Sequence, residues 1–335
     1  MRDPLVAVVD WKQSPRGDSK CIVEKEVLGK STNVKYFLCN NDSDWKGNLL
    51  EADVILLWHN THMSSTVINK LQDCKAIIRN GTGYDTVDWL AAASRDIPVC
   101  NVPDYGTEEV ADHSIALSLA LCRQIIPIDK ECKKLGWEIP NKEKIRRLSC
   151  MNFGVVGLGR IGTSVALKAK ALGFKTWFYD PYLSNGVNKS LNINREKDFT
   201  EFLKSMDIIS VNCPLTEETR YMFTSKEFKL MKNTSFIVNT ARGPIIKKID
   251  LFKALKGNKL AGAALDVIED EPLRTKEEAE TPNLIATCHS GFFSQEASYE
   301  MRHSAATIAK AAIQNKELEN CINEKCLPRN WVSNE

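Results

Sequence analysis

Apolar residues recur along the chain in short runs, and stretches with helical spacing of apolar positions separate these runs. In the N-terminal third, four apolar runs have the length of buried strands, at positions 5–9, 34–39, 52–58 and 75–79. Helical spacing appears between them, as at 65–71 and 87–94. Because strands that alternate with helices form a parallel sheet with helices on both faces, this part of the chain predicts a doubly wound α/β domain.

The same alternation returns in the second half of the chain. Four further apolar runs each end in polar residues, at positions 207–214, 235–243, 260–267 and 284–289. In a parallel sheet these polar ends lie on one edge, and in doubly wound sheets ligands bind beyond that edge. A last helix is predicted over 294–315, and it can return to pack on the first domain.

One stretch of the second half, Gly157-Leu158-Gly159-Arg160-Ile161-Gly162, has the spacing G-x-G-x-x-G. An apolar run precedes it, and a helical run over 160–172, closed by Gly173, follows it. Gly157 would let the chain turn off the strand, Gly159 would let the backbone approach a pyrophosphate, and Gly162 would let the helix pack on the sheet. The N–H groups that begin the helix would then bind the phosphates.

Asp180 ends the next apolar run, at 176–180. A carboxylate at this position can accept hydrogen bonds from both hydroxyls of an adenosine ribose and would repel a 2′-phosphate. The alternative is a glycine-rich turn without a chemical role, but it does not account for the strand before the glycines, the helix after them and the acid at this distance. The predicted cofactor is therefore NAD rather than NADP.

Two doubly wound parallel-sheet domains are predicted, and Pro103 looks like a hinge between them. A Rossmann coenzyme domain would cover 104–293, and a smaller flavodoxin-like substrate domain would combine 1–103 with 294–335. The coenzyme domain would begin with a long helix over 107–123, with Thr107 as its N-cap. That helix is apolar nearly all round, which predicts burial on more than one side and suits a dimer interface.

Two strand ends in the first domain carry polar residues that could bind a substrate. His59 and His62 could be metal ligands, but two histidines three apart without a partnered carboxylate are a weak signal, so we expect no metal, His59 on the substrate side and His62 at the surface. Arg79 ends a buried strand and needs an anionic partner, either a carboxylate substrate or a structural aspartate. Gly81 and Gly83 would free the next loop to present N–H groups to such an anion.

The composition of the 335 residues, 43% hydrophobic and 26% charged, is ordinary for a globular protein of two domains. The 45 basic and 43 acidic residues are mixed along the chain, which gives no reason to expect direct binding to nucleic acid or a membrane. The apolar run at 5–9 is too short for a signal peptide, and no stretch approaches the roughly 20 residues that span a bilayer. We therefore expect a cytoplasmic or nuclear protein.

The eleven cysteines are scattered, without a C-x-x-C pair. Several of them, namely Cys39, Cys74, Cys100 and Cys122, lie inside apolar runs. This pattern predicts buried, reduced thiols rather than a disulfide framework or a zinc site.

Three residues at predicted strand ends suit hydride transfer to the C2 carbon of a 2-oxo acid. That reaction needs a cation for the carboxylate or carbonyl, an acid that protonates the oxygen, and a group that keeps the acid in its working state. Arg242, His289 and Glu271 are of these three types, and the carboxylate would fix the tautomer of the imidazole and favour its charged form. The structural alternatives are an ion-pair partner for Arg242, a strand-end residue for His289 and a turn residue for Glu271.

The chain resembles the D-isomer-specific 2-hydroxyacid dehydrogenases in the motifs at 157–162, 178–182, 238–243, 263–267 and 269–272. Within that family, the stretch at 178–187 and the pair Trp58-His59 are most similar to the C-terminal-binding proteins, a branch that includes NAD-dependent transcriptional corepressors. This resemblance covers nearly the whole chain.

The resemblance implies a catalytic set of Arg242, Glu271 and His289, and a homodimer through the coenzyme domain. It implies a substrate set composed of His59, Arg79, Gly81, Thr82, Gly83, Arg242 and Phe292. The implied coenzyme residues, with Asp266 near the nicotinamide amide, are Thr82, Gly157, Leu158, Gly159, Arg160, Ile161, Gly162, Asp180, Cys213, Pro214, Thr219, Thr240, Ala241, Arg242, Asp266, His289 and Gly291.

Three functional hypotheses follow. The first is an NAD-dependent D-2-hydroxyacid dehydrogenase, and the second is an NAD-sensing dimeric corepressor scaffold that recruits peptide motifs and turns over little. Phosphoglycerate dehydrogenase is the third, although such enzymes commonly carry a regulatory extension. C-terminal-binding proteins have Trp three residues after the catalytic His, whereas this chain has Phe292, so their preference for thioether-containing keto acids is not carried over.

Overall fold

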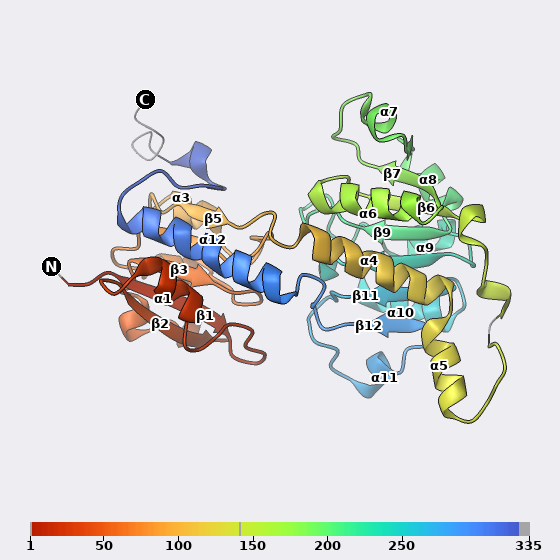
Figure 1. The fold of residues 1–335 in the computed structure, drawn as a ribbon, viewed down its shortest axis with the longest axis horizontal. Coiled ribbons are helices and arrows are strands. Elements are labelled where there is room, and N and C mark those ends of the chain that lie inside the picture. The colour runs from red at the N-terminus through yellow and green to blue at the C-terminus, as the bar shows by residue number, and fades with distance from the viewer. Residues whose placement is uncertain (1, 141, 328–335) are drawn as a thin grey trace. The chain divides into compact units, whose positions relative to one another are not determined.

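The computed structural model describes residues 2–140 and 142–327, which group into two compact units (Figure 1). One unit is Gly106–Phe293, and the other combines the chain up to Tyr105 with the chain from Ser294 onward. The boundaries predicted from the sequence lie at 103 and 293. The last part of the predicted segment 294–335, residues 328–335, lies outside the described residues.

The unit that contains the N-terminal strands has a five-stranded sheet in which all strands are parallel. Their order is β2-β1-β3-β4-β5, which is the flavodoxin-like doubly wound order. The interior strands β3 and β4 are buried at every position, which explains why they lie in continuous apolar runs. The strands are β1 (Leu5–Trp11), β2 (Asn33–Cys39), β3 (Val54–Leu57), β4 (Ala76–Arg79) and β5 (Val99–Asn101).

Helices cover both faces of this sheet. The helices α2 (Ser65–Ile68) and α3 (Trp89–Ala93) pack on one face, and α1 (Ile22–Leu28) and α12 (Gln295–Ile313) pack on the other. The helix α12 begins after the N-cap Ser294 and runs beside α1, which confirms the predicted return of the chain (Figure 1). Arg302 of α12 and Glu24 of α1 form a buried ion pair with an N–O distance of 2.6 Å.

The other unit has a seven-stranded sheet, also parallel throughout. Its order, β12-β11-β10-β9-β6-β7-β8, is the Rossmann order with one further strand at an edge. The predicted fold class, two doubly wound parallel sheets, is therefore confirmed. The strands are β6 (Asn152–Val156), β7 (Lys175–Tyr179), β8 (Asn194–Arg195), β9 (Ile208–Val211), β10 (Phe236–Asn239), β11 (Gly262–Leu265) and β12 (Leu284–Ala286).

Two helices of this unit, α4 (Thr107–Cys122) and α6 (Arg160–Ala171), lie side by side on one face of its sheet (Figure 1). The opposite face is covered by α8 (Phe199–Ser205), α9 (Ser225–Leu230) and α10 (Lys248–Lys256). Further helices in the connections are α5 (Ile125–Lys133), α7 (Val187–Leu191) and α11 (Lys276–Ala279). Among the described residues, no helix combines the length and the apolar character that crossing a membrane requires.

The structure corrects one expectation about α4, its N-cap, and confirms its burial on more than one side. Its N-cap is Gly106 and not Thr107, which is the first helical residue. Much of the apolar surface predicted for a partner is covered inside the same unit, because α4 packs against α6, β10 and β11. Exposed apolar side chains occur instead on α5 and the segment after it, at Ile125, Ile126, Leu135, Trp137 and Ile139.

All eleven cysteines lie among the described residues and carry free thiols. Cys39, Cys100 and Cys122 are buried, as predicted. Cys74 is half-buried as a residue, but its thiol is buried as predicted, and burial raises the pKa of that thiol to about 12. It lies in the turn before β4, where its thiol donates to the Ala76 carbonyl at 3.4 Å.

Candidate active site

The glycine turn between β6 and α6 has the geometry of a phosphate-binding loop. Gly157 has a φ of +84°, and a Cβ there would lie 2.7 Å from the Cα of Cys213. A Cβ at Gly162 would lie 2.0 Å from the Gly157 carbonyl oxygen, so these two positions require glycine. A Cβ at Gly159 would meet nothing within 4 Å, which leaves open space before the first N–H groups of α6. These features fit the pyrophosphate of a dinucleotide.

Asp180 follows β7 directly, and its carboxylate is tied to the glycine turn. One oxygen accepts the Leu158 N–H at 2.9 Å, and the other accepts the Tyr182 N–H at 3.0 Å. Each carboxylate oxygen has a second lone pair, so the half-exposed group can still accept hydrogen bonds from a ribose. Asp180 therefore both braces the turn and presents acceptors beside it.

The loop after β9 carries three of the predicted coenzyme residues. Cys213 lies against the glycine turn, and burial raises the pKa of its thiol to about 12. Thr219 folds the loop because its hydroxyl donates to the Pro214 carbonyl at 2.6 Å and accepts the Thr216 N–H at 2.8 Å. These contacts fix the loop at the carboxyl edge of the sheet, next to the glycines.

The loop after β10 carries Thr240, Ala241 and Arg242. The Thr240 hydroxyl is hydrogen-bonded to Ser114 of α4 at 2.6 Å, and Asn239 donates to the Arg242 carbonyl at 2.9 Å. A Cβ at Gly243 would lie 2.1 Å from the carbonyl carbon of Ile268. This close approach packs the Arg242 turn on the segment that leads from β11 to Glu271.

His289 and Glu271 come together in this unit, as their predicted roles require. The imidazole Nδ1 lies 3.0 Å from Glu271 Oε2, and each side chain retains about a fifth of its exposure, 18% and 19%. A carboxylate at Nδ1 fixes the tautomer that carries a proton there and orients Nε2 for chemistry. Because β10, β11 and β12 are neighbours in the sheet, Arg242, Glu271 and His289 all lie at its carboxyl edge.

Asp266, which follows β11, holds the turn that carries His289. Its buried carboxylate accepts the Ser290 N–H and the Gly291 N–H, each at 2.9 Å. It also accepts the Thr287 hydroxyl at 2.6 Å and lies 3.4 Å from His113 Nε2. Burial opposes ionisation, but the hydrogen bonds from His113, Thr287, Gly291 and Ser290 outweigh it and lower the pKa of Asp266. The contacts seen here make Asp266 a positioning group, and its predicted contact with nicotinamide stays a prediction.

His113 and Thr287 were missed by the sequence reasoning. His113 lies in the middle of α4, and its Nε2 is 3.0 Å from the Thr287 hydroxyl. A helical apolar pattern around a single histidine gives no sign of a partner so far along the chain. Thr287 could have been found, because it lies in the same strand-end stretch as His289.

Phe292 packs against the proposed proton donor. Its ring centroid lies 6.5 Å from that of His289, and the two rings are nearly perpendicular at 80°. A Cβ at Gly106 would lie 3.5 Å from the Phe292 Cβ, so this aromatic side chain also contacts the start of α4. The predicted residue Phe292 is thus brought together with His289.

The remaining predicted substrate residues belong to the other unit, at the carboxyl ends of β3 and β4. His59 and Arg79 are buried there, and the Arg79 Nη1 donates to the Asn80 carbonyl. Gly81 has a φ of +136°, and a Cβ there would lie 2.4 Å from that Nη1. The Thr82 hydroxyl donates to the Pro103 carbonyl at 3.2 Å.

Two further buried polar residues lie in these predicted strand-end stretches, although neither was singled out as a substrate residue. Among the described residues, the Thr61 hydroxyl and both polar atoms of the Asn80 amide have no hydrogen-bond partner. Buried polar groups usually have partners, so these two mark the loops after β3 and β4 as a place for a polar ligand. Gly83 lies in the same loop as Asn80, and His62 is exposed, as expected.

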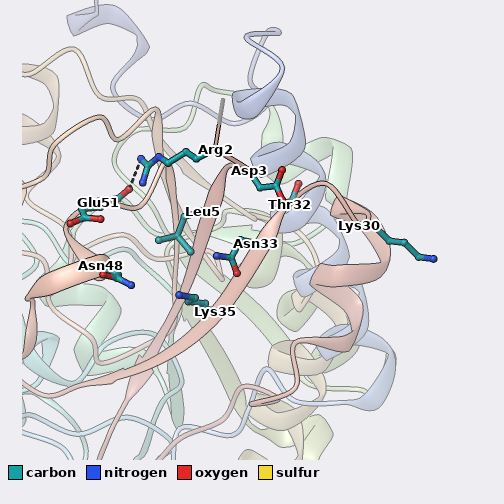
Figure 2. Close-up of a pocket in the computed structure, with 9 residues that line it drawn as sticks. All are labelled: Arg2, Asp3, Leu5, Lys30, Thr32, Asn33, Lys35, Asn48 and Glu51. Carbon is teal, nitrogen blue, oxygen red and sulfur yellow. Dashed lines mark hydrogen bonds between the residues drawn. The ribbon is translucent and has the colours of Figure 1, made fainter.

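A separate hollow of about 540 Å³ lies at the opposite, amino-terminal end of β1 and β2 (Figure 2). Figure 2 shows Leu5 and Asn33, the first residues of the two strands, between Arg2 and Lys35. Ligands of doubly wound sheets bind at the carboxyl edge, so this hollow is not the candidate site. Within the described part of the chain, no group of three or more His, Cys, Asp or Glu residues is placed to hold a metal ion.

Comparison with known families and curated proteins gives one consistent assignment. The family model described as D-isomer specific 2-hydroxyacid dehydrogenase, NAD binding domain, matches residues 115–291. The chain is 35% identical over 279 residues to D-3-phosphoglycerate dehydrogenase of Methanocaldococcus jannaschii, covering 83% of this chain and 53% of that protein. It is 30% identical over 340 residues to C-terminal-binding protein 1 of Caenorhabditis elegans, covering 98% of this chain and 46% of that protein.

The comparison with solved structures agrees. D-Lactate dehydrogenase from Aquifex aeolicus, complexed with NAD and lactic acid, is similar with a TM-score of 0.80 and 26% identity. That similarity covers 92% of this chain and 95% of the other. The chain spans about half the length of the curated relatives it matches, 53% and 46%.

Proposed function

Because the chain belongs to the D-isomer-specific 2-hydroxyacid dehydrogenase family, with a domain that binds NAD, we propose that it interconverts a small 2-oxo acid and its D-2-hydroxy acid. The observation that carries this proposal is the His289–Glu271 contact of 3.0 Å beside the Arg242 turn. A scaffold that only binds NAD has no need of an oriented imidazole at the carboxyl edge of the coenzyme sheet. The family was predicted from the sequence and is confirmed.

The proposed roles follow from charge and geometry. NAD, when bound, supplies or accepts the hydride. Glu271 holds Nδ1 of His289, so that Nε2 donates a proton to the substrate oxygen during reduction and accepts it during oxidation. Arg242 stabilises the negative charge that develops on that oxygen. Asp266 keeps the His289 turn in place through the Ser290 and Gly291 N–H groups.

The proposed coenzyme residues divide by the part of NAD that they would bind. The glycine turn at 157–162 binds the pyrophosphate, and Asp180 binds the adenosine ribose and disfavours NADP. The rest of the proposed coenzyme set is Thr82, Cys213, Pro214, Thr219, Thr240, Ala241, Arg242, Asp266, His289 and Gly291. The proposed substrate set remains His59, Arg79, Gly81, Thr82, Gly83, Arg242 and Phe292.

The test is a panel of 2-oxo acids that includes glyoxylate, pyruvate, hydroxypyruvate and 3-phosphohydroxypyruvate, with NADH oxidation followed by absorbance. At least one member should be reduced, and His289→Ala should lower kcat by about 10²–10⁴-fold, as the loss of a general acid does. The variant should still bind NADH, since the glycine turn and Asp180 are unchanged. A wild-type protein that binds NADH and reduces no member of the panel contradicts the proposed activity.

A second candidate function is an NAD-sensing corepressor scaffold with little turnover. The similarity to C-terminal-binding protein 1, which extends over 98% of this chain, favours it. The two functions are distinguished by turnover and by partner capture at saturating NADH. The scaffold function is supported if the protein captures defined peptide motifs and does not turn over any 2-oxo acid. A fluorescent fusion shows whether the protein is cytoplasmic or nuclear.

We also propose a homodimer through the coenzyme unit. Leu135 is 97% exposed and Trp137 is 91% exposed, and large apolar side chains this open are typical of surfaces that a partner covers. The variant Trp137→Glu should shift the protein from dimer to monomer in light scattering. The matched control is Ile249→Glu on α10, where an exposed apolar residue of the same unit should leave the mass unchanged.

A further inference from the structure

After α12 the chain returns to the sheet of the N-terminal unit and pairs with β5. The Asn101 N–H donates to the Asn320 carbonyl at 3.3 Å, and the Ile322 N–H donates to the Val99 carbonyl at 2.7 Å. Asn323 reinforces the pairing, because its side chain accepts the Val99 N–H and donates to the Ile97 carbonyl, both at 2.9 Å. The segment 320–323 thus covers an edge of the sheet that would otherwise be open.

This pairing places Cys100 directly opposite Cys321 in an antiparallel bridge. The two flanking hydrogen bonds join Asn101 to Asn320 and Ile322 to Val99, so the cysteines form a non-hydrogen-bonded pair. In such a pair the Cα atoms lie about 4.5 Å apart and the side chains approach each other closely. That separation falls within the range of about 4.4–6.8 Å that a disulfide spans without movement of the backbone.

The two cysteines are opposite each other in the bridge and differ in environment. Cys100 is fully buried in the sheet, whereas Cys321 is half-buried. The Cys321 thiol donates to the Asn323 Oδ1 at 3.4 Å. The neighbouring Cys100 thiol lowers the pKa of Cys321, and the Cys321 thiol together with burial raises the pKa of Cys100. Cys321 is therefore the better nucleophile and the more accessible of the two.

We propose that Cys100 and Cys321 form a reversible redox modification site, a disulfide made by a peroxide-class oxidant and opened by a dithiol reductant. The Cys321 thiolate attacks one oxygen of hydrogen peroxide, the O–O bond breaks, and sulfenic acid and hydroxide form. The Cys100 sulfur then attacks the Cys321 sulfur and displaces hydroxide, which leaves as water with the Cys100 proton. The two sulfurs are oxidised and one peroxide is reduced to two waters in total.

The link would fasten the returning segment 320–323 to β5 by a covalent bond in addition to its hydrogen bonds. It involves the N-terminal unit alone and does not rest on the proposed dehydrogenase activity. In the reduced state, opening of this edge would release the β5 N–H and carbonyl groups. Oxidation would therefore convert a hydrogen-bonded edge into a locked one.

The first measurement is peptide mapping of the full chain after mild peroxide treatment, alkylation of the remaining thiols and digestion without reductant. Wild type should give a peptide that joins Cys100 to Cys321, and dithiothreitol should abolish it. The variant Cys321→Ser should not form it. The matched control Cys326→Ser removes an exposed thiol of the same segment and should form the link as wild type does. The proposal is overturned if both cysteines are still alkylated after peroxide treatment. It is also overturned if Cys321 is oxidised to sulfinic or sulfonic acid while Cys100 stays reduced.

The second measurement is hydrogen exchange at the Ile322 amide, which remains informative if a variant folds poorly. Oxidised wild type should exchange this amide at least tenfold more slowly than reduced wild type. Cys321→Ser should show the same rate with and without peroxide. Equal rates in oxidised and reduced wild type overturn the inference that the pair locks this edge.

Discussion

Replacing Asp266 with Asn tests the network that holds His289 without changing the size of the side chain. One oxygen of Asp266 accepts Thr287 and Ser290 and faces His113, and the other accepts only the Gly291 N–H among these groups. In Asp266→Asn the amide oxygen would therefore replace the oxygen that accepts Thr287 and Ser290, and the amide NH₂ would face the Gly291 N–H. One hydrogen bond to a charged group is lost, and two buried donors face each other.

The expected cost follows from these changes. A hydrogen bond to a charged group contributes about 1.5–3 kcal/mol, and a buried donor left unsatisfied costs about 1–3 kcal/mol. The two terms overlap, so Asp266→Asn should lower the free energy of unfolding by about 2–4 kcal/mol at neutral pH. Denaturant unfolding of wild type and variant measures this difference. The matched control is Asp112→Asn, which breaks an exposed ion pair with Lys168 and should cost below about 1 kcal/mol.

The pH dependence gives a second readout of the same network. The pKa of Asp266 is lowered in the folded state, so its stabilising contribution is complete above the unfolded-state value of about 4 and is lost as the pH falls towards the folded-state value. The difference between Asp266→Asn and wild type should therefore shrink below about pH 4. A displaced His289 turn should also lower kcat, by about 10²-fold for a shift of 1 Å. If Asp266→Asn loses no more stability and no more kcat than the Asp112→Asn control, this reasoning is refuted. A raised Kd of Asp266→Asn for NADH supports the coenzyme contact predicted for Asp266.

Three further predictions concern other parts of the molecule. Wild type should bind NADH more tightly than NADPH, and the variant Asp180→Ala should reduce the ratio of the two Kd values, which a fluorescence titration measures. Equal affinities of wild type for the two coenzymes contradict the assignment of Asp180. Gly162→Ala should destabilise the fold by about 1–3 kcal/mol, because its Cβ would overlap the Gly157 carbonyl. Its control, Gly159→Ala, should leave thermal unfolding unchanged but weaken NADH binding, since the added methyl group enters the open space of the turn. Glu24→Gln should lower stability by about 1.5–3 kcal/mol in chemical denaturation, because Arg302 loses its closer charged acceptor and keeps only the Asp18 carboxylate at 3.4 Å. A loss below about 1 kcal/mol argues against the Arg302–Glu24 ion pair.

The strands could be predicted well because most are buried on both faces. The apolar run at 52–58 contains β3 (Val54–Leu57), and the run at 75–79 corresponds to β4 (Ala76–Arg79); both strands are buried at every position. The two-residue strand β8 (Asn194–Arg195) is polar and at the edge of its sheet, so it leaves no apolar signal. The helix predicted over 65–71 is shorter in the structure, Ser65–Ile68.

The candidate site residues could be predicted where an ionisable residue follows a predicted strand. Glu271 and His289 follow adjacent strands, and the topology of a parallel sheet brings such ends together. His113 and the Cys100–Cys321 pair could not be predicted, because packing brings together segments that are far apart in the chain. The N-cap of α4 was misplaced by one residue because Thr at the start of a helical pattern is a common cap, whereas the chain uses Gly106.

The central claim is hydride transfer to a 2-oxo acid, and isotope transfer tests it most directly. NADH deuterated at the transferable position is incubated with the protein and the panel of 2-oxo acids, and the products are separated by chiral chromatography and analysed by mass spectrometry. The proposed chemistry predicts a D-2-hydroxy acid that carries one deuterium at C2, formed by wild type and lost in His289→Ala. An L product, or no deuterated product from a protein shown to bind NADH, contradicts it.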